Sequence, residues 1–241
     1  MIEPISPIPD LTIFNIKGEA LVSFKFHKTL RGADLSAASL KGISLCEANL
    51  KGVDLSFANL CGTDLWGADL TNAFLAGANL SCANFSYAYL NHANLSAANL
   101  IGTVLTHADL IIANFSFADL SGADLTRANL GCANLSSAKL SGANLSRADL
   151  RFANLSSANL SGANLRGANL SCAILRSADL SGADLSGANL YCADSWYANF
   201  NGAKWLFLLN YTDVIENGTD AEFSDASLVL TKPRSNRKKL T

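Results

Sequence analysis

The sequence has few of the features that place a protein in a membrane or an export pathway. Hydrophobic residues make up 49% of the 241 residues, yet the longest apolar run is WLFLL at positions 205–209. A membrane-spanning helix needs about 18 consecutive apolar residues. The first residues, MIEPISPIPDL, contain no basic stretch of the kind that opens a signal peptide. We therefore expect a cytoplasmic protein without a membrane span.

Residues that carry chemistry are also scarce. The three histidines (positions 27, 92 and 107) have no partner serine or aspartate at a catalytic spacing, and no phosphate-binding glycine loop is present. The six cysteines (46, 61, 82, 132, 172 and 192) include no CxxC pair, so zinc binding is weakly indicated and reduced thiols are favoured. The sequence predicts no catalytic residue, no cofactor, no metal site and no enzymatic activity.

The chain carries little net charge, and the repeat is nearly neutral. Formal net charge is −2, and positions 28–204 carry 12 acids and 11 bases. Five bases fall in the last segment, TKPRSNRKKLT, which is typical of a solvated tail. Nucleic-acid binding by so short a run is not expected.

The dominant feature is a five-residue repeat without insertions. Between positions 28 and 202 there are 35 units, with Leu at the centre of 31, Phe at three (Phe85, Phe115 and Phe200) and Ser at one (Ser195). Ala commonly stands two places before the centre, and Asp or Asn directly before it in 27 units. The run SGANLSRADLRFANLSSANLSGANL, at positions 141–165, shows the pattern most plainly.

A period of five fits neither a helix nor a straight strand. On an α-helix five residues advance about 140° beyond full turns, so the leucines would spiral around every side. On a strand an odd spacing sends successive leucines to opposite faces. Only a chain that turns after each unit keeps every leucine inside. The second place after Leu is Gly in 14 of 35 units, as expected for a corner with positive φ.

These residues resemble the pentapeptide-repeat proteins, whose consensus is A-(D/N)-L-x-x. The resemblance implies an all-β fold, a right-handed quadrilateral parallel β-helix in which four units close one coil. It implies about nine coils stacked into a rod roughly 42 Å long, with terminal caps. The regular Asp and Asn positions predict surface ladders and corner hydrogen bonds.

The repeat boundaries divide the chain into four segments. We predict an N-terminal cap at 1–27, with short strands or a degenerate coil at 11–26 and a partner-binding arm as the alternative. The β-helix follows at 28–202, a C-terminal cap with a partial coil at 203–230, and a basic disordered tail at 231–241. A homodimer interface is the alternative to the C-terminal cap, and the residues concerned are Trp205, Leu206, Phe207 and Leu209.

Each unit has two variable positions, which usually hold small residues. We expect functional residues where these positions hold large apolar or charged side chains instead. Apolar and basic side chains gather in the middle of the repeat, and exposed clusters of this kind are typical of protein-binding sites. The candidate patch comprises Ile101, Val104, His107, Ile111, Ile112, Phe117, Arg127, Arg147, Arg151 and Phe152. The alternative is scattered drift on a tolerant surface. One column predicted from the 20-residue period places Cys172 beside Cys192, which leaves either a disulfide or two thiols.

Three functions are compatible with this pattern. We favour a non-enzymatic repeat scaffold that binds an unidentified protein. The resemblance also implies a DNA mimic that binds a type II topoisomerase and protects it from quinolones, but mimicry needs a strongly negative rod and this one is nearly neutral. A regulatory or structural protein of cyanobacteria, where the family is abundant, is the third.

Overall fold

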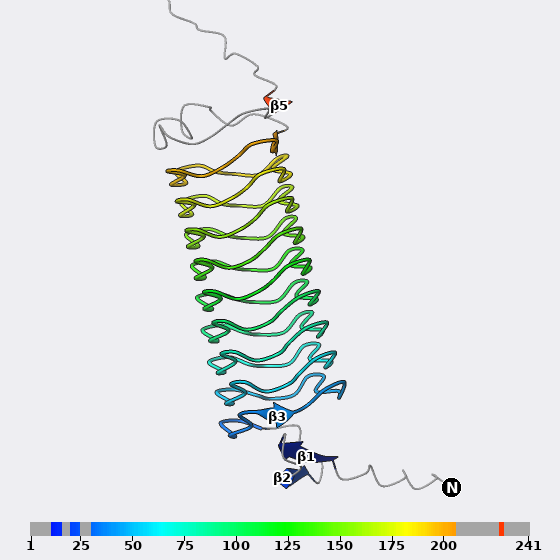
Figure 1. Ribbon diagram of the computed structural model, residues 1–241. Helices are drawn as coiled ribbons and strands as arrows, with labels where there is room; N and C mark the ends of the chain where they lie inside the picture. The colour runs from blue at the N-terminus through cyan, green and yellow to red at the C-terminus, as the bar shows by residue number, and fades with distance from the viewer. Residues whose placement is uncertain (1–10, 16–19, 25–29, 206–226, 229–241) are drawn as a thin grey trace, which may run out of the picture.

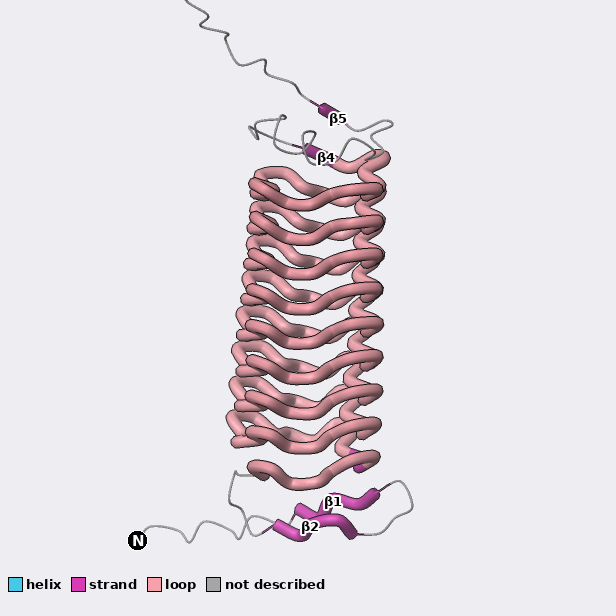
Figure 2. Tube along the Cα trace, turned by 90° about the vertical axis from the view of Figure 1, so that its left-hand side faces the viewer, coloured by secondary structure: helices cyan, strands magenta, loops and turns pink. Residues whose placement is uncertain are grey.

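The chain forms a straight rod of stacked coils (Figures 1 and 2). The computed structural model describes residues 11–15, 20–24, 30–205 and 227–228. Every fifth residue from 34 to 184 pairs in parallel with the residue 20 positions later, so Asp54 pairs with Phe74 and Phe74 with Asn94. Four units therefore bring the chain back to the same side one level higher. The predicted parallel β-helix is confirmed.

Each unit ends in a tight turn set by the corner residues. The N–H of Ala33 donates to the carbonyl of Leu30 at 3.0 Å, and the same bond recurs in the following units. The third residue of each turn has a positive φ, at all 14 glycines and at the other residues that occupy this place. This is the arrangement of a type II turn. The predicted preference for glycine therefore has a conformational cause.

The Asp or Asn before each leucine stabilises the corner that follows. Its side-chain oxygen accepts the backbone N–H two residues later, as Asp54 does from Ser56 at 2.9 Å and Asn154 from Ser156 at 3.0 Å. Asparagines one coil apart also bond to each other, with Asn134 donating to Asn114 at 3.2 Å. These contacts confirm the predicted ladders and corner bonds.

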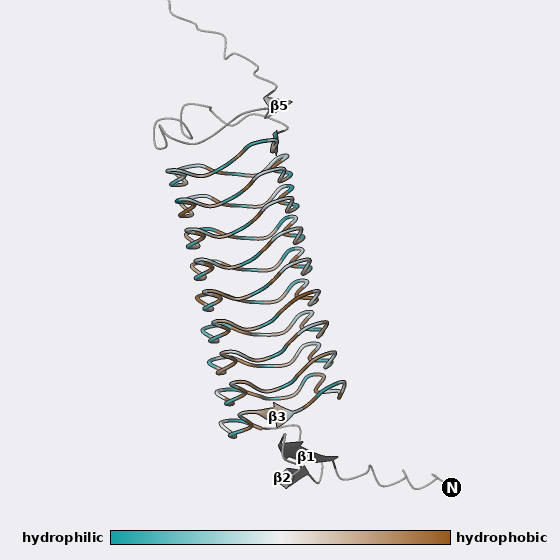
Figure 3. Ribbon diagram, viewed as in Figure 1, coloured by the Kyte–Doolittle hydropathy of each residue, from teal (hydrophilic) through white to brown (hydrophobic). Residues whose placement is uncertain are grey.

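The interior consists of the alanine and leucine columns. Nearly all of these side chains are buried, and Phe85, Phe115 and Phe200 are among the largest that are fully enclosed. Backbone bonds run along the rod, since the N–H of Leu55 donates to the carbonyl of Phe74 at 2.7 Å. Apolar and polar positions alternate along every coil (Figure 3). Burying one leucine side chain contributes about 2 kcal/mol, which alone does not offset the entropy lost in ordering the five residues of its unit. The unit is stable only because neighbouring coils pack against it in the same column.

Short strands pair at both ends of the repeat. Strands β1 (Leu11–Asn15) and β2 (Ala20–Phe24) are antiparallel, and β1 also pairs antiparallel with β3 (Ala38–Ser39) of the first coil. At the other end β4 (Lys204–Trp205) pairs in parallel with β5 (Ser227–Leu228). The predicted short strands near the N-terminus are therefore present.

Other predicted features of the ends fall on residues that the structure does not describe. Leu206, Phe207, Leu209 and the basic segment 231–241 lie outside the described residues, and so does the side chain of Trp205. Within the described part of the chain, no helix is long and apolar enough to cross a bilayer.

Candidate functional site

Two of the four corners carry the candidate functional residues. Because the pattern repeats every 20 residues, side chains 20 apart form a column along the rod. We call one column the arginine corner; it contains Tyr87, His107, Arg127 and Arg147. We call the next corner along the chain the cysteine corner; it contains His92, Ile112, Cys132, Phe152, Cys172 and Cys192. A third corner, from Gly42 to Gly202, is glycine at every level except Cys82.

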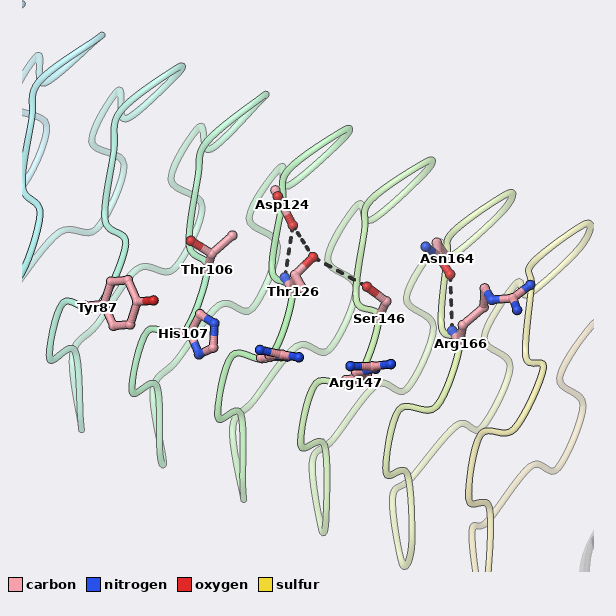
Figure 4. Close-up of a pocket in the computed structure, with 10 residues that line it drawn as sticks. Tyr87, Thr106, His107, Asp124, Thr126, Ser146, Arg147, Asn164 and Arg166 are labelled. Atoms are coloured by element: carbon pink, nitrogen blue, oxygen red, sulfur yellow. Dashed lines mark hydrogen bonds between the residues drawn. The ribbon is translucent and has the colours of Figure 1, made fainter.

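Planar groups line up along the arginine corner (Figure 4). The rings of Tyr87 and His107 stack with centroids 4.9 Å apart and planes 3° from parallel, and Trp66 lies 6.1 Å from Tyr87. The stem of Arg147 lies over Gly167, where an added Cβ would be 3.6 Å from its Cγ. All four side chains of the column are exposed.

A shallow open groove of about 650 Å³ runs beside this column. Besides the column, it is lined by Thr106, Asp124, Thr126, Ser146, Asn164 and Arg166. Asp124 accepts two hydrogen bonds from Thr126, from its N–H at 3.0 Å and its hydroxyl at 2.6 Å. The hydroxyl of Thr126 accepts the Asn144 amide at 2.8 Å. These polar groups are therefore already engaged within the groove.

The two arginines of the column differ from the five cations of the described rod that form ion pairs. Five described cations form ion pairs with aspartates, and the pairs are Lys51–Asp69, Lys139–Asp119, Arg151–Asp149, Arg166–Asp184 and Arg176–Asp194. Among the described residues, Arg127 and Arg147 form no ion pair. Their guanidinium groups therefore face the solvent beside the groove with their donors available.

The cysteine corner is apolar where a glycine would be easier to accommodate. The side chains of Ile112 and Phe152 are 49% and 61% exposed, and Cys132 lies exposed between them. Ile112 has a φ of 60° and Phe152 one of 58°. A β-branched residue in this left-handed region is a true outlier. Ile112 and Phe152 therefore adopt an unfavourable backbone conformation, although their exposed side chains contribute little to the interior.

One charged pair borders the cysteine corner. The guanidinium of Arg151 donates to both carboxylate oxygens of Asp149, at 2.9 Å and 2.6 Å. These side-chain hydrogen bonds are the main cause that lowers the pKa of Asp149, against the opposing effect of partial burial. Arg151 is thus tied to the rod, in contrast to Arg127 and Arg147.

Comparison with known proteins identifies the repeat. The family profile described as Pentapeptide repeats matches eight copies, over residues 30–67, 62–96, 88–127, 128–167 and 168–204. The chain belongs to the pentapeptide-repeat family. No curated protein matches it significantly.

Several solved pentapeptide-repeat structures are similar to the chain. HetL, involved in heterocyst differentiation regulation in the cyanobacterium Nostoc sp. strain PCC 7120, is 36% identical over 73% of this chain and 88% of its own, with a TM-score of 0.47. The protein alr5209 from the same Nostoc is 40% identical over 42% of this chain and 84% of its own, with a TM-score of 0.36. QnrB1, a plasmid-mediated fluoroquinolone resistance protein, is 21% identical over 78% of this chain and 90% of its own, with a TM-score of 0.42.

The pentapeptide rod separates much of the patch expected from sequence. His107, Arg127 and Arg147 share the arginine corner, while Ile111, Ile112, Arg151 and Phe152 share the cysteine corner. The others lie elsewhere: Ile101 at the glycine corner, Val104 on the face between the glycine and arginine corners, and Phe117 at the fourth corner. Positions 101–117 span most of one coil, so apolar side chains that are close in the sequence point in different directions from the rod.

Some residues of these corners were absent from the sequence-based patch. Tyr87, Trp66 and Arg166 contribute to the stack or the groove at the arginine corner. The available signal was the 20-residue period, which places Tyr87 directly before His107 in its column. The patch was chosen from the apolar places between 101 and 117 and the basic residues beside them, and Tyr87 is neither.

The cysteines and acids of the rod form no metal site in the part of the chain that the structure describes. All six cysteines lie in that part, and none is disulfide-bonded. Cys172 and Cys192 occupy successive levels of the cysteine corner as thiols, which is the second of the two alternatives that the sequence allows.

Proposed function

We propose that this protein is a non-enzymatic scaffold that binds another protein through the apolar side chains of the cysteine corner. In this proposal the rod has about nine coils, and the segments 1–27 and 203–230 cover its two ends. The proposal rests on the conformation of Ile112, which is an exposed β-branched residue with a φ of 60°.

The cost of Ile112 argues for a role outside the fold. A non-glycine residue in the left-handed region costs about 1–2 kcal/mol, and β-branched residues are among the least suited to it. The glycine corner demonstrates that the same turn closes without any side chain. An exposed isoleucine therefore adds strain without a matching gain in packing, and contact with a partner would provide that gain.

The neighbours of Ile112 extend the same surface. Cys132 and Phe152 follow it one and two levels along the column, which spaces Ile112 and Phe152 about 10 Å apart. Arg151, paired with Asp149, supplies a polar edge. An apolar centre with an aromatic residue and a polar rim is the usual composition of a protein-binding surface.

The charge distribution favours this function over DNA mimicry. A mimic that occupies a DNA-binding site must present a dense array of negative charges in place of phosphates. Positions 28–204 carry 12 acids and 11 bases, and five of these acids pair with lysine or arginine in the described rod at distances of 2.5–3.3 Å. Two exposed arginines add positive charge at one corner. These features support a scaffold rather than a DNA mimic that binds a type II topoisomerase.

Glycine substitutions separate the structural role of the corner from its binding role. Ile112→Gly together with Phe152→Gly in the full-length chain should leave the thermal midpoint unchanged or higher, because glycine adopts this corner without strain. The matched control is Ser137→Gly with Ser157→Gly. These two serines occupy the same place of the turn at the fourth corner, so the control introduces the same two glycines but removes only small side chains.

The proposal is tested by affinity purification from the cells that express the protein, followed by mass spectrometry. A partner recovered with the wild-type and control proteins should be lost with the Ile112 and Phe152 variant. Recovery of the same partners in equal amounts from all three would overturn the proposal.

A further inference from the structure

We infer that the arginine corner is a second binding site, which takes an acidic peptide segment of a partner protein. In this site Arg127 and Arg147 bind carboxylates of the peptide, and the edges of Tyr87 and His107 line the rest of its path. The inference does not depend on the cysteine corner, because the two corners are different edges of the rod.

The first reason is the state of the two guanidinium groups. Both are exposed beside the groove and neither has an ion pair among the described residues, whereas Arg166, at the far side of the groove, pairs with Asp184 at 3.3 Å. Asp124 is the one acid among the residues that line the groove, and its Oδ1 accepts hydrogen bonds from Thr126. A guanidinium presents paired N–H donors that match a carboxylate. Carboxylates of a partner are therefore the natural complement.

The second reason is that the rod holds this column in place. The N–H of Arg127 donates to the carbonyl of Ser146, and that of Arg147 to the carbonyl of Arg166, so each level is tied to the next. These bonds fix the backbone at both arginines, and the stack of Tyr87 on His107 restricts two side chains of the column. Side chains that are already ordered lose less entropy on binding. On the side of the rod, the ordering cost of binding a short peptide is therefore limited largely to the two arginine side chains.

The third reason is the length of the column. Three strand spacings separate Tyr87 from Arg147, or about 14 Å. An extended peptide rises about 3.3 Å per residue, so four or five residues cover the column. Two acidic residues close together in such a segment would reach both arginines. Ring edges at the Tyr87 end offer a hydroxyl and an imidazole for further hydrogen bonds.

The charges favour a peptide over a nucleic acid. Stable electrostatic binding of DNA commonly involves about 6–10 phosphate contacts. The groove has only two arginines without ion pairs among the described residues, and Asp124 lies within it. The whole repeat is close to neutral, with 12 acids and 11 bases at positions 28–204. Local contacts rather than a long-range field must therefore select the ligand.

A peptide-display selection tests the inference while the partner is still unidentified. A library of random 12-residue peptides is selected on the immobilised full chain, and in parallel on the variant Arg127→Gln with Arg147→Gln. The wild-type selection should enrich peptides with two or more Asp or Glu residues close together. The variant should lose that enrichment, and individual peptides should bind it at least about tenfold more weakly.

Matched variants distinguish a specific site from general charge. Arg151→Gln with Arg176→Gln removes the same number of charges from paired arginines that do not line the groove, and should keep affinity within about threefold. Equal acidic enrichment on the Arg127 and Arg147 variant would overturn the inference, and so would a wild-type selection without acidic enrichment. A DNA oligonucleotide that binds more tightly than the selected peptides and depends on the same two arginines would also overturn it.

Discussion

The second residue after each central leucine is set by the turn geometry and also carries most of the candidate functional side chains. All 35 units have a positive φ there, and only 14 of them carry glycine, while the other 21 carry another residue. The fold accepts these residues because the turn is closed by its own hydrogen bond and by the stacked coils. Each corner side chain is thus retained at a conformational cost of about 1 kcal/mol or more. Large side chains at this place are the residues most worth testing for function.

Glycine-to-alanine substitutions measure that cost directly. Gly122 has a φ of 64° and no atom within 4 Å of an added Cβ, so Gly122→Ala should cost about 1 kcal/mol from backbone strain alone. At Gly77 an added Cβ would meet the ring of Phe57 at 2.6 Å, so Gly77→Ala should cost about 1 kcal/mol more as the ring is displaced. Chemical denaturation compares the two variants. If Phe57→Ala fails to reduce the extra cost, the contact is not its source.

A buried hydroxyl makes Ser195 a weak point of the leucine column. Its side chain is 1% exposed, and its oxygen has no hydrogen-bond partner among the described residues. Ser195→Ala should therefore leave stability unchanged or raise it by up to about 1 kcal/mol. Thr63 is the control, because its buried hydroxyl donates to the carbonyl of Leu40 at 2.7 Å. Thr63→Val should cost about 1 kcal/mol in the same denaturation experiment, and equal effects of the two changes would contradict this explanation.

The ion pair at Asp149 gives the rod a small dependence on pH. Hydrogen bonds from Arg151 lower the pKa of Asp149 in the folded state, so its contribution is present above the unfolded pKa and is lost as pH falls through the folded value. Asp149→Asn should lower stability at pH 7 by no more than about 1 kcal/mol, since the pair is partly exposed. The difference from wild type should therefore shrink as pH falls below the ordinary aspartate pKa of about 3.9. Thermal midpoints across pH 2–7 check this, and a difference independent of pH would exclude the charge as its cause.

At the scale of the element, the coil has no independent stability. Its pairing consists of single-residue bridges to the levels above and below, and the leucine columns are continuous through the described rod. Stability in such arrays is a sum over neighbouring repeats. The position of a defect along the rod should therefore decide how much of the molecule it affects.

Two leucine substitutions test this dependence on position. Leu135→Ala, in the middle of the rod, should lower global stability by about 2–5 kcal/mol because it leaves a cavity between two long stacks. Leu185→Ala, near the end, should mainly release the last coils. Hydrogen exchange should then show lost protection around residues 165–205 and unchanged protection around residues 60–120 in the second variant. Uniform loss along the rod would contradict the neighbour model.

At the scale of the whole molecule, the repeat made most of the architecture predictable. Leu at every fifth place requires a turning chain, and glycine at places such as Gly142 marks the corner with positive φ. Asn before Leu predicted the bonds later seen at Asn134 and Asn154. These inferences succeed because each depends on residues a few places apart or on one fixed period.

The candidate sites were harder to predict because they depend on what lies one level away. The sequence shows that Arg127 and Arg147 are basic, but ion pairing depends on side-chain positions in neighbouring coils. Arg166 has the same charge and is paired with Asp184, 18 residues later. Similarly, Phe117 is close to Ile112 in the sequence and still lies at another corner. Periodicity predicts the column of a residue, whereas its partners require coordinates.

The uninterrupted period of 20 has a consequence for how such a protein can change its length. Loss of one five-residue unit rotates everything beyond it by a quarter turn, whereas loss of four units shortens the rod and preserves every alignment. A deletion of positions 133–137 would thus move Arg147 to the corner now occupied by Gly142. Arg127 and Arg147 would then lie at different corners, although neither residue is removed. Any surface that spans several levels therefore constrains the number of units between its members, even where those units contribute no contact of their own.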